Sequence, residues 1–379
     1  MSEAAEAIVV GAGPAGLAVA AAFKARGIEP AILEKADAVG AVWRRHYDRL
    51  HLHTDRGHSG LPGLPIPKEY GRYPARDQVV AYLESYARKS ELHPVFGAWV
   101  REIRRAGGQW RADAGDRSWS APVVVVATGY ADFPHSPTWP GMETFGGDIL
   151  HSSRYRNPAP FAGKRVLVVG FGNSGGEIAL DLAEAGIDVT LSVRGPVRIL
   201  PREMLGRPIL SWTIPQRRLP ARLTDFLSAP LIRLHVGSVE SLGMIPAAKG
   251  PRRMVEEDGR VPLLDVGTLK AIRAGRIKVR GDLAGFEPGR VRFAKSEPEA
   301  FGAVILATGF HADLRPLLPD AEGVLNAAGR PYVSGRPTAE PGLFFCGAIT
   351  VATGQLREFG IEAGRIAEAA AAGRRSRAA

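Results

Sequence analysis

The sequence contains a single cysteine, Cys346, among its 379 residues. One thiol excludes a disulfide framework and a CxxC redox pair, and it argues against a cysteine-based metal site. Long hydrophobic runs are also missing, because stretches such as Pro122–Ala127 are far shorter than the roughly 20 residues of a membrane-spanning helix. The short acidic N-terminus does not fit a signal peptide. A chain so poor in thiols suits the reducing cytoplasm, which is the location we expect.

Acidic residues are fewer than basic ones, which leaves a formal net charge of +10. The basic residues are mostly arginine and are scattered, so we expect them to attract cofactor phosphates and an anionic substrate. Nucleic-acid binding is the alternative, and we expect no nucleic-acid partner. The one dense cluster, Arg374–Arg377, is expected to be a frayed terminus. The length suffices for two domains with substantial cores.

Two stretches of the chain each predict a strand, a helix and a second strand. A short buried strand that leads into a helix and a parallel strand is typical of a nucleotide-binding βαβ unit. Two such units predict an α/β fold with two Rossmann-like dinucleotide-binding domains. The first unit comprises Ile8–Val10, Leu17–Ala25 and Pro30–Leu33, and the second comprises Arg165–Gly170, Ser174–Ala185 and Asp188–Val193.

Apolar patterns predict further elements around these units. Helices are expected at Asp77–Arg88, Val266–Ala274 and Gly360–Ala372. Strands are expected at Phe96–Ile103, Gln109–Ala112, Val123–Ala127, Ile277–Val279, Arg290–Phe293, Ala303–Ala307 and Leu343–Gly347.

The segment Pro201–Ala248 mixes proline, arginine and bulky apolar residues without a strand period. Within it, Leu223–Val236 fits an amphipathic helix. We expect an ordinary packed insertion, with a substrate lid and a membrane-surface contact as alternatives. The apolar residues on or near one helix face are Leu223, Phe226, Leu227, Leu231 and Leu234.

The first glycine motif runs from Gly11 to Gly16, between a predicted strand and a predicted helix. Gly11 permits a tight turn, Gly13 lets a pyrophosphate reach the backbone, and Gly16 lets helix and strand pack closely. Glu34 ends the next strand, where a carboxylate accepts hydrogen bonds from ribose hydroxyls. Together these residues predict a dinucleotide site.

The second motif runs from Gly170 to Gly175 and has the same context. Its following strand ends in Arg194 rather than in an acidic residue. A guanidinium pairs with a 2′-phosphate, so this half is expected to prefer NADPH over NADH. A solvated surface arginine is the alternative. Arg198 and Arg202 are further candidates for the same phosphate.

Ala127-Thr128-Gly129 and Ala307-Thr308-Gly309 form a near repeat, and each follows an apolar strand. Both glycines permit a sharp change of direction. We interpret the two copies as the points where the chain crosses between one nucleotide domain and another inserted into it.

A longer motif, Phe145-x-Gly147-x-x-x-His151-x-x-x-Tyr155, resembles the signature of class B flavin monooxygenases. Further stretches are similar to the YUCCA-type branch, and together they extend over most of the chain from residue 8 to residue 370. These stretches are Tyr47–His53, Tyr73–Gln78, Gly172–Gly175, Leu200–Gly206 and Leu264–Leu269.

The resemblance implies an FAD-binding domain at 1–150 and 295–379, with an NADPH-binding domain at 151–294 that carries an insertion at about 201–248. Expected FAD contacts are Gly11, Gly13, Pro14, Ala15, Gly16, Glu34, Lys35, Gly40, Val42, Trp43, Val100, Thr128, Gly129, Gln355 and Leu356. Expected NADPH contacts are Gly170, Gly172, Asn173, Ser174, Gly175, Arg194, His151, Ser152, Ser153, Thr308 and Gly309. No metal is expected.

The resemblance also implies the reaction. NADPH reduces the flavin, which then forms a C4a-hydroperoxide with O₂ and oxygenates a small molecule, either a 2-oxo acid such as an aryl-pyruvate or a soft nitrogen or sulfur nucleophile. Tyr155 favours these over the Baeyer–Villiger branch, which usually carries Trp there. His53 and Thr54 are candidate contacts of the reacting oxygen. An NADPH oxidase or flavin reductase and a non-catalytic redox sensor are the alternatives.

Overall fold

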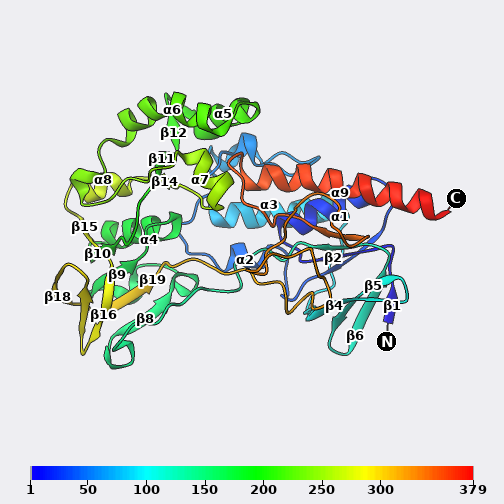
Figure 1. Cartoon of the computed structure of the whole chain (residues 1–379), viewed down its shortest axis with the longest axis horizontal. Helices are drawn as coiled ribbons and strands as arrows, with labels where there is room; N and C mark the ends of the chain where they lie inside the picture. Colours follow the sequence, from blue (N-terminus) through cyan, green and yellow to red (C-terminus); the bar gives the residue numbers. More distant parts are fainter. Residues whose placement is uncertain (1, 379) are drawn as a thin grey trace. The chain divides into compact units, whose positions relative to one another are not determined.

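The structure is a computed structural model that describes residues 2–378 (Figure 1). It divides into unit 1, residues 1–44, 55–133 and 311–379, and unit 2, residues 45–54 and 134–310. The predicted α/β class with one half inserted into the other is confirmed. The division falls earlier than residue 150 and later than residue 295, because β8 (Asp148–His151) and β19 (Ala303–Leu306) pair with each other in the sheet of unit 2.

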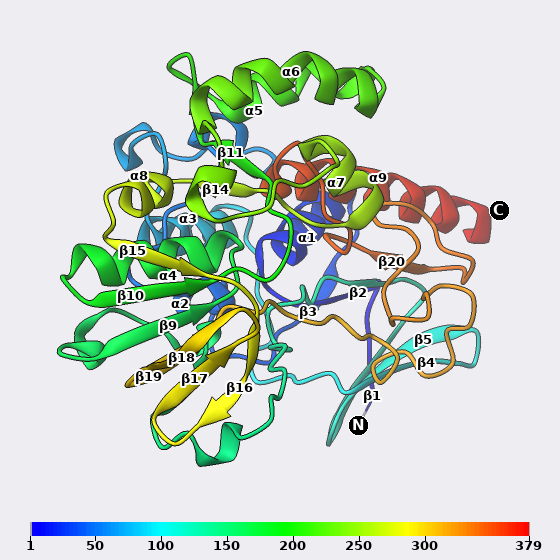
Figure 2. The ribbon, with the colours of Figure 1, turned by 60° about the vertical axis from the view of Figure 1, so that its left-hand side comes forward.

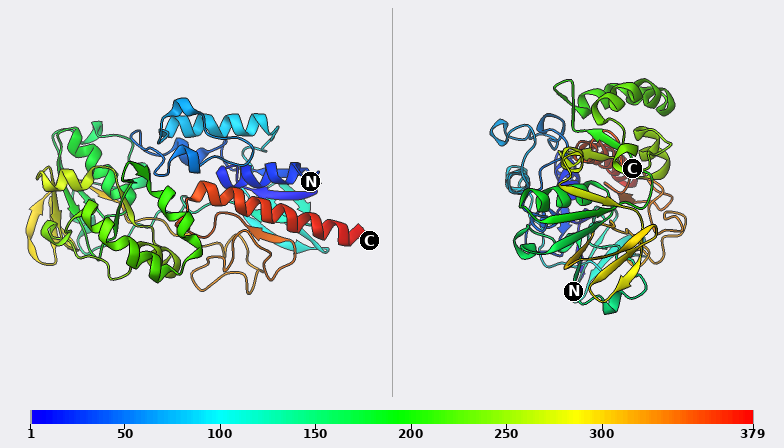
Figure 3. Two further views of the ribbon diagram at one scale, coloured as in Figure 1. Left: turned by 90° about the horizontal axis from the view of Figure 1, so that it is seen from above. Right: turned by 90° about the vertical axis from the view of Figure 1, so that its left-hand side faces the viewer.

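Unit 1 is built on a parallel sheet of order β20-β7-β2-β3. Strands β2 and β7 are buried throughout, which suits a parallel sheet covered on both faces. Helices α1 and α9 run side by side along this unit, as Figures 1 and 3 both show. The elements are β2 (Ala7–Val10), α1 (Pro14–Lys24), β3 (Pro30–Leu33), α2 (Ala41–Arg44), α3 (Arg76–Lys89), β7 (Val124–Val126), β20 (Leu343–Phe345) and α9 (Gln355–Ala378).

A second sheet of unit 1 has the order β1-β6-β5-β4, formed by β1 (Ser2–Ala4), β6 (Arg117–Ala121), β5 (Gln109–Ala114) and β4 (Glu102–Ala106). The predicted strand at Phe96–Ile103 is wrong up to residue 101. Gly97 has φ +72°, and the amides of Trp99 and Val100 bond to carbonyls only two residues back. These tight turns prevent ladder pairing before Glu102.

Unit 2 contains five parallel strands in the order β15-β10-β9-β19-β8 (Figure 2). A three-stranded antiparallel sheet, β16-β17-β18, adds Phe286 and Phe293 to a core shared with Leu167 and Leu306, and Phe301, directly after β18, belongs to the same core. The elements are β9 (Arg165–Val169), α4 (Asn173–Glu184), β10 (Asp188–Ser192), α8 (Thr268–Arg273), β15 (Ile277–Arg280), β16 (Leu283–Glu287), β17 (Arg290–Phe293) and β18 (Ser296–Ala300).

The segment between β10 and α8 forms a small helical layer of unit 2. The strands are β11 (Ile199–Pro201), β12 (Glu203–Met204), β13 (Arg207–Pro208) and β14 (Leu263–Asp265), and the helices are α5 (Ile209–Thr213), α6 (Ala221–Val236) and α7 (Pro251–Asp258). The predicted helix at Leu223–Val236 is confirmed as α6. Its apolar face is exposed at four of the five predicted positions, so an ordinary packed insertion is the wrong interpretation of that face.

Short 3₁₀ helices occupy the loops at η1 (Arg56–His58), η2 (Lys68–Tyr70), η3 (Met142–Thr144), η4 (Ser152–Arg154), η5 (Ala159–Phe161), η6 (Pro215–Arg218) and η7 (Glu240–Leu242).

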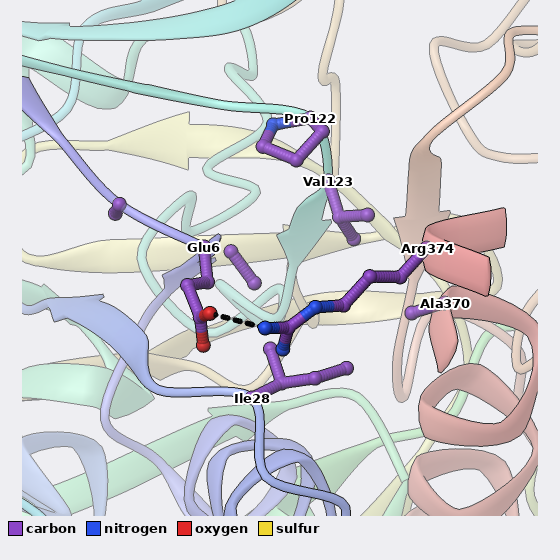
Figure 4. A pocket seen from close by; sticks show the side chains of 8 residues that line it. Glu6, Ile28, Pro122, Val123, Ala370 and Arg374 are labelled. Atoms are coloured by element: carbon purple, nitrogen blue, oxygen red, sulfur yellow. Dashed lines mark ion pairs between the residues drawn. The ribbon is translucent and has the colours of Figure 1, made fainter. Parts of the chain in front are cut away.

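The end of α9 is tied to the start of unit 1. The Arg374 guanidinium lies 2.9 Å from a Glu6 carboxylate oxygen and donates a 2.9 Å hydrogen bond to the Gly27 carbonyl (Figure 4). The pair crosses a pocket of about 310 Å³ that Ile28 and Val123 also line. The expectation that Arg374 lies in a frayed terminus is therefore wrong, because the helix continues to Ala378 and its arginine has partners in unit 1.

We expect Gly16→Ala to destabilise the fold. A Cβ atom at Gly16 would lie 1.8 Å from the Gly11 carbonyl oxygen, so α1 would be forced off β2. Overpacking of this kind lowers the free energy of unfolding by roughly 1–3 kcal/mol or more. Gly13→Ala is the matched control, because a Cβ there meets nothing within 4 Å and only the helix N-cap preference for glycine is lost. Thermal unfolding of the apoprotein measures both, and equal melting temperatures would contradict the prediction.

Two candidate nucleotide sites

The first glycine bend of unit 1 is held against the neighbouring strand end. Gly11 has φ +109°, and a Cβ there would lie 2.6 Å from the Ala127 carbonyl oxygen. The bend therefore requires glycine for its backbone angle and for its close approach. Two residues later, a Cβ at Gly13 would meet no atom within 4 Å. The bend joins β2, whose neighbours are β3 and β7, so it lies where the strand order reverses, the usual nucleotide position in such sheets.

Glu34 fixes the shape of this cradle from the end of β3. Its buried carboxylate accepts hydrogen bonds from the amide of Ala12 at 2.7 Å and from the amide of Ala36 at 2.9 Å. Each carboxylate oxygen keeps a second lone pair for a further donor. Glu34 thus organises the bend and retains capacity for the ribose hydroxyls that the sequence predicts for it.

The other predicted FAD contacts all lie in unit 1. The Gly40 amide donates to the Ala12 carbonyl at 3.1 Å, which brings the stretch before Trp43 against the first bend. Lys35 forms a 2.9 Å ion pair with Asp132. Val42 and Trp43 are half-buried on α2, and Val100 is buried.

At the start of α9, Gly354 has φ +92° and directly precedes Gln355 and Leu356. Amides in the first turn of a helix have no partner within the helix, so these two residues can donate to a ligand. The Gln355 side chain donates to the Ile349 carbonyl at 3.1 Å and so closes the preceding loop.

Unit 2 repeats the geometry of the first bend. Gly170 has φ +107°, and a Cβ there would lie 2.5 Å from the Ala307 carbonyl oxygen. A Cβ at Gly175 would lie 2.1 Å from the Gly170 carbonyl oxygen, whereas Gly172 is open. The Asn173 side chain accepts from the Leu264 amide at 2.7 Å and so ties the start of α4 to β14.

The structure explains why the Ala-Thr-Gly sequence occurs once in each unit. In each unit the alanine carbonyl of the repeat is the surface against which the first glycine of the bend packs. Gly129 and Gly309 have φ of +68° and +86°, which confirms the predicted change of direction. Thr308 donates its hydroxyl to the His135 carbonyl at 2.5 Å, close to the point where the chain leaves unit 2.

Arg194 follows β10 and is exposed, with no ion-pair partner among residues 2–378. Two other arginines of the same sheet, Arg165 and Arg280, both pair with Glu299. Arg198 donates to the Ala247 carbonyl, and burial lowers its pKa. Arg194 is thus an exposed cation just beyond the carboxyl end of β10.

The signature segment is held together inside unit 2. Phe145 packs edge-on against Phe286, and Gly147 has room only for hydrogen beside the Gly302 carbonyl. The Tyr155 hydroxyl donates to Asp181 at 2.7 Å, and burial raises the pKa of Tyr155 well above its usual range. Three of the four signature residues, Phe145, Gly147 and Tyr155, therefore have packing or hydrogen-bonding roles within this unit.

His151 links the signature to the Ala-Thr-Gly repeat. Its Nε2 lies 3.0 Å from the Gly309 carbonyl, so Nε2 carries the proton. Its Nδ1 accepts from the Ser153 amide at 3.1 Å, and burial lowers the pKa of the ring. His151 and Ser152 are buried. The imidazole is thus a neutral structural bridge beside the second cradle.

A ten-residue excursion, Arg45–Thr54, belongs to unit 2 although its sequence neighbours belong to unit 1. Tyr47 donates its hydroxyl to the buried Glu177 on α4 at 2.5 Å, and the His53 Nε2 lies 3.2 Å from the same carboxylate oxygen. Arg49 forms an ion pair with Glu184 on the same helix. The predicted contact residue His53 is therefore positioned by the helix that opens at the second glycine bend.

Burial and neighbouring groups shift the pKa values of the residues around Glu177. Burial acts to raise the pKa of Glu177, but hydrogen bonds from His53 and Tyr47 outweigh it and the net pKa is lowered. Burial lowers the pKa of His46 to about 4, with help from Arg156. Glu177 is therefore ionised and His46 neutral at pH 7.

No motif in the sequence predicts a role for Glu177 or Asp181. A recognisable signal exists, because the two carboxylates stand four residues apart on a helix that otherwise packs apolar residues. Four histidines lie close together in this part of the sequence, at positions 46, 51, 53 and 58. They have separate partners, since His58 pairs with Asp55, His51 bonds to the Arg49 carbonyl and His53 lies beside Glu177. Within residues 2–378, no cluster of three or more His, Cys, Asp or Glu residues could hold a metal ion. The same residues contain no helix that is long and apolar enough to span a membrane.

Comparisons with known proteins agree with this geometry. Residues 8–204 match the family described as pyridine nucleotide-disulphide oxidoreductase. The chain is 42% identical over 328 residues to an indole-3-pyruvate monooxygenase, YUCCA1, from Oryza sativa subsp. japonica, with 85% of this chain and 81% of the relative covered. It is 38% identical to the indole-3-pyruvate monooxygenase YUCCA6 from Arabidopsis thaliana, with 81% and 76% covered.

Among solved structures, a flavin-containing monooxygenase from Stenotrophomonas maltophilia aligns over 98% of this chain and 99% of its own, with a TM-score of 0.73 and 26% identity. The disulphide chemistry in the family description needs a pair of thiols, whereas this chain has one cysteine, which is buried. The chain therefore belongs to the pyridine nucleotide-disulphide oxidoreductase family, as a member of its FAD- and NADPH-dependent flavin monooxygenases of the YUCCA type.

Proposed function

We propose that this flavin monooxygenase acts on a 2-oxo acid of the aryl-pyruvate type, and that unit 1 binds FAD and unit 2 binds NADPH. The relatives named above are indole-3-pyruvate monooxygenases and match most of the chain. The basic surface is complementary to a substrate carboxylate. A cytoplasmic location is part of the proposal and is supported by the single cysteine.

The observation that carries the cofactor assignment is the open second glycine of each bend. Packing within the protein explains why glycine stands at four positions of the bends, because a Cβ there would collide with backbone. These positions are Gly11, Gly16, Gly170 and Gly175. Packing does not explain the glycines at 13 and 172, because a Cβ at either position meets nothing within 4 Å. Both Gly13 and Gly172 also have φ angles that any residue adopts. A pyrophosphate against the bare backbone at a helix N-terminus fits this open space.

The FAD residues that we propose are the bend, Pro14, Ala15 and the side chains that organise it. The Glu34 carboxylate accepts hydrogen bonds from the ribose hydroxyls, and the first-turn amides of Gln355 and Leu356 donate hydrogen bonds to the flavin ring. Lys35, Gly40, Val42, Trp43, Val100, Thr128 and Gly129 complete the set in unit 1.

The NADPH residues that we propose lie around the second bend. Gly172, Asn173 and Ser174 present the start of α4 to the pyrophosphate, and Arg194 pairs with the 2′-phosphate. His151 holds Gly309 beside the bend, and Ser152, Ser153 and Thr308 complete the set. Glu177 and Tyr47 orient His53, which with Thr54 is the side chain that we propose to approach the reacting oxygen.

FAD and NADPH, when bound, supply hydride transfer and the activation of O₂. The described side chains contribute binding, orientation and charge, which is why the chain needs no catalytic triad. The buried Glu177 carboxylate keeps the His53 ring in one orientation, since only Nε2 reaches it.

We expect the purified protein to be yellow, to consume O₂ with NADPH, and to convert an aryl-pyruvate to the aryl-acetate and CO₂. Mass spectrometry of products across a panel of aryl-pyruvates, amines and sulfides measures this. Incorporation of one ¹⁸O atom from ¹⁸O₂ into the product identifies a monooxygenase. Hydrogen peroxide as the sole product for every panel member would instead establish an NADPH oxidase.

Gly13→Ala is expected to fold normally and to lose FAD, because its methyl group occupies the space of the pyrophosphate. We expect at least a tenfold weaker FAD affinity, about 1.4 kcal/mol. Gly172→Ala is the matched variant and is expected to keep FAD while its Kd for NADP⁺ rises at least tenfold. Fluorescence titration of FAD and calorimetry with NADP⁺ separate the two, and loss of the opposite cofactor in each variant would reverse the assignment.

Arg194→Gln is expected to raise the KM for NADPH at least tenfold and to leave the KM for NADH unchanged, because charge-assisted bonds to a phosphate contribute roughly 1.5–3 kcal/mol. Arg276→Gln, an exposed arginine of the same unit, is the control and is expected to change neither constant. Steady-state kinetics with both coenzymes test this. A parallel loss of NADH use would assign Arg194 a role other than 2′-phosphate recognition.

A further inference from the structure

Helix α6 (Ala221–Val236) presents an apolar stripe outward. Leu223, Phe226, Leu227 and Leu234 are 43%, 76%, 59% and 78% exposed. Phe226 and Leu227 follow Leu223 by three and four residues, and Leu234 follows Leu227 by seven, so all four lie along one face of the helix, with exposed Pro230 between them. We call these four exposed apolar residues the α6 stripe.

The buried face of the same helix combines the apolar Ile232 and Val236 with two polar residues. Thr224 and Asp225 are buried, and the Asp225 carboxylate accepts from the amides of Arg252 at 2.9 Å and Arg253 at 3.1 Å at the start of α7. A Cβ at Gly250 would collide with Asp225, so the two helices are in close contact there. In Figures 1 and 2, α7 and β11 lie on the side of α6 that faces the rest of unit 2.

The guanidinium of Arg252 reinforces this orientation. It donates to the carbonyls of Gln216 at 2.8 Å and Leu219 at 2.7 Å, and to the Thr224 hydroxyl at 3.1 Å. Turning the apolar face of α6 inward would break the bonds that Thr224 and Asp225 make and leave the α7 amides and the Arg252 guanidinium without these acceptors. The outward direction of the stripe is therefore built into the packing of the layer.

The surroundings of the stripe are positively charged. Arg217, Arg218, Arg222 and Arg233 are exposed, and none has an ion-pair partner within the described residues. Between residues 205 and 237 the single acidic residue is Asp225, which is buried. Contact between two copies of this face would bring arginines together, whereas a negatively charged surface is complementary to it.

We propose that α6 docks the enzyme on an anionic lipid surface, with the α6 stripe inserted at the boundary of headgroups and acyl chains and the flanking arginines bound to lipid phosphates. An exposed helix with Phe and Leu on one side and arginines beside them has the chemistry of interfacial helices. At 16 residues, α6 lies along the surface and does not cross it. The four arginines add electrostatic attraction that salt screens.

The test uses the full-length FAD-loaded enzyme in flotation with vesicles. We expect at least tenfold more binding to phosphatidylcholine vesicles that contain 30% phosphatidylglycerol than to phosphatidylcholine alone. Phe226→Ser/Leu227→Ser is expected to reduce binding at least tenfold, and Arg218→Gln/Arg222→Gln to remove the preference for anionic vesicles. Tyr332→Ser, which alters a side chain of unit 1 that is 62% exposed, is the matched control and is expected to bind like the wild type.

A labelled variant keeps the proposal testable if the double serine variant fails to fold. Because Cys346 is buried, Leu227→Cys can carry an environment-sensitive fluorophore, with Tyr332→Cys as the control. A blue shift on anionic vesicles at residue 227 alone supports insertion. Absence of binding by the wild type, an unchanged label at residue 227, or a dimer that Phe226→Ser/Leu227→Ser converts to a monomer without any vesicle binding would each overturn the proposal.

Discussion

A single contact, used twice, underlies both candidate cofactor sites: a glycine bend pressed against an alanine carbonyl of the neighbouring strand end. Gly11 rests on Ala127 and Gly170 on Ala307, at distances that admit no side chain. This contact sets where each following helix begins and therefore where its free amides point. Glu34 then braces the first bend with two hydrogen bonds, while Asn173 ties the start of the second helix to β14. In the sites that we propose, cofactor binding depends on these two backbone arrangements more than on any reactive side chain.

Much of the fold could be predicted because its signals are local. The runs at β2 and β9 are apolar on both faces, and each leads into a glycine bend, so the two nucleotide folds could be recognised from their spacing alone. The predicted strand at residues 96–101 failed because the turn at Gly97 outweighs the apolar pattern around it. The partnership of Tyr47 and His53 with Glu177 could not be predicted, because it joins residues more than a hundred positions apart. Periodicity likewise identified the apolar face of α6 but contained no information on whether that face is covered.

The small helical layer shows how polar packing can determine the direction of an apolar surface. Asp225 accepts hydrogen bonds from two amides of α7, and Arg252 donates to carbonyls just before α6. The face of α6 that carries Asp225, together with Ile232 and Val236, is therefore the buried one. Buried charges that are fully paired in this way contribute orientation more than net stability. Because these contacts hold one face of α6 against the layer, the leucines and the phenylalanine of the opposite face are exposed.

The excursion at residues 45–54 constrains how this protein can be recombined. The chain enters and leaves the larger segment of unit 2 at neighbouring points, because Pro134 and Phe310 form a β-bridge. A chimera made by exchanging residues 134–310 alone would nevertheless leave Glu177 facing a foreign Tyr47–His53 segment, or none at all. Exchanging unit 2 between relatives therefore requires both of its segments, although 79 residues of unit 1 separate them in the sequence.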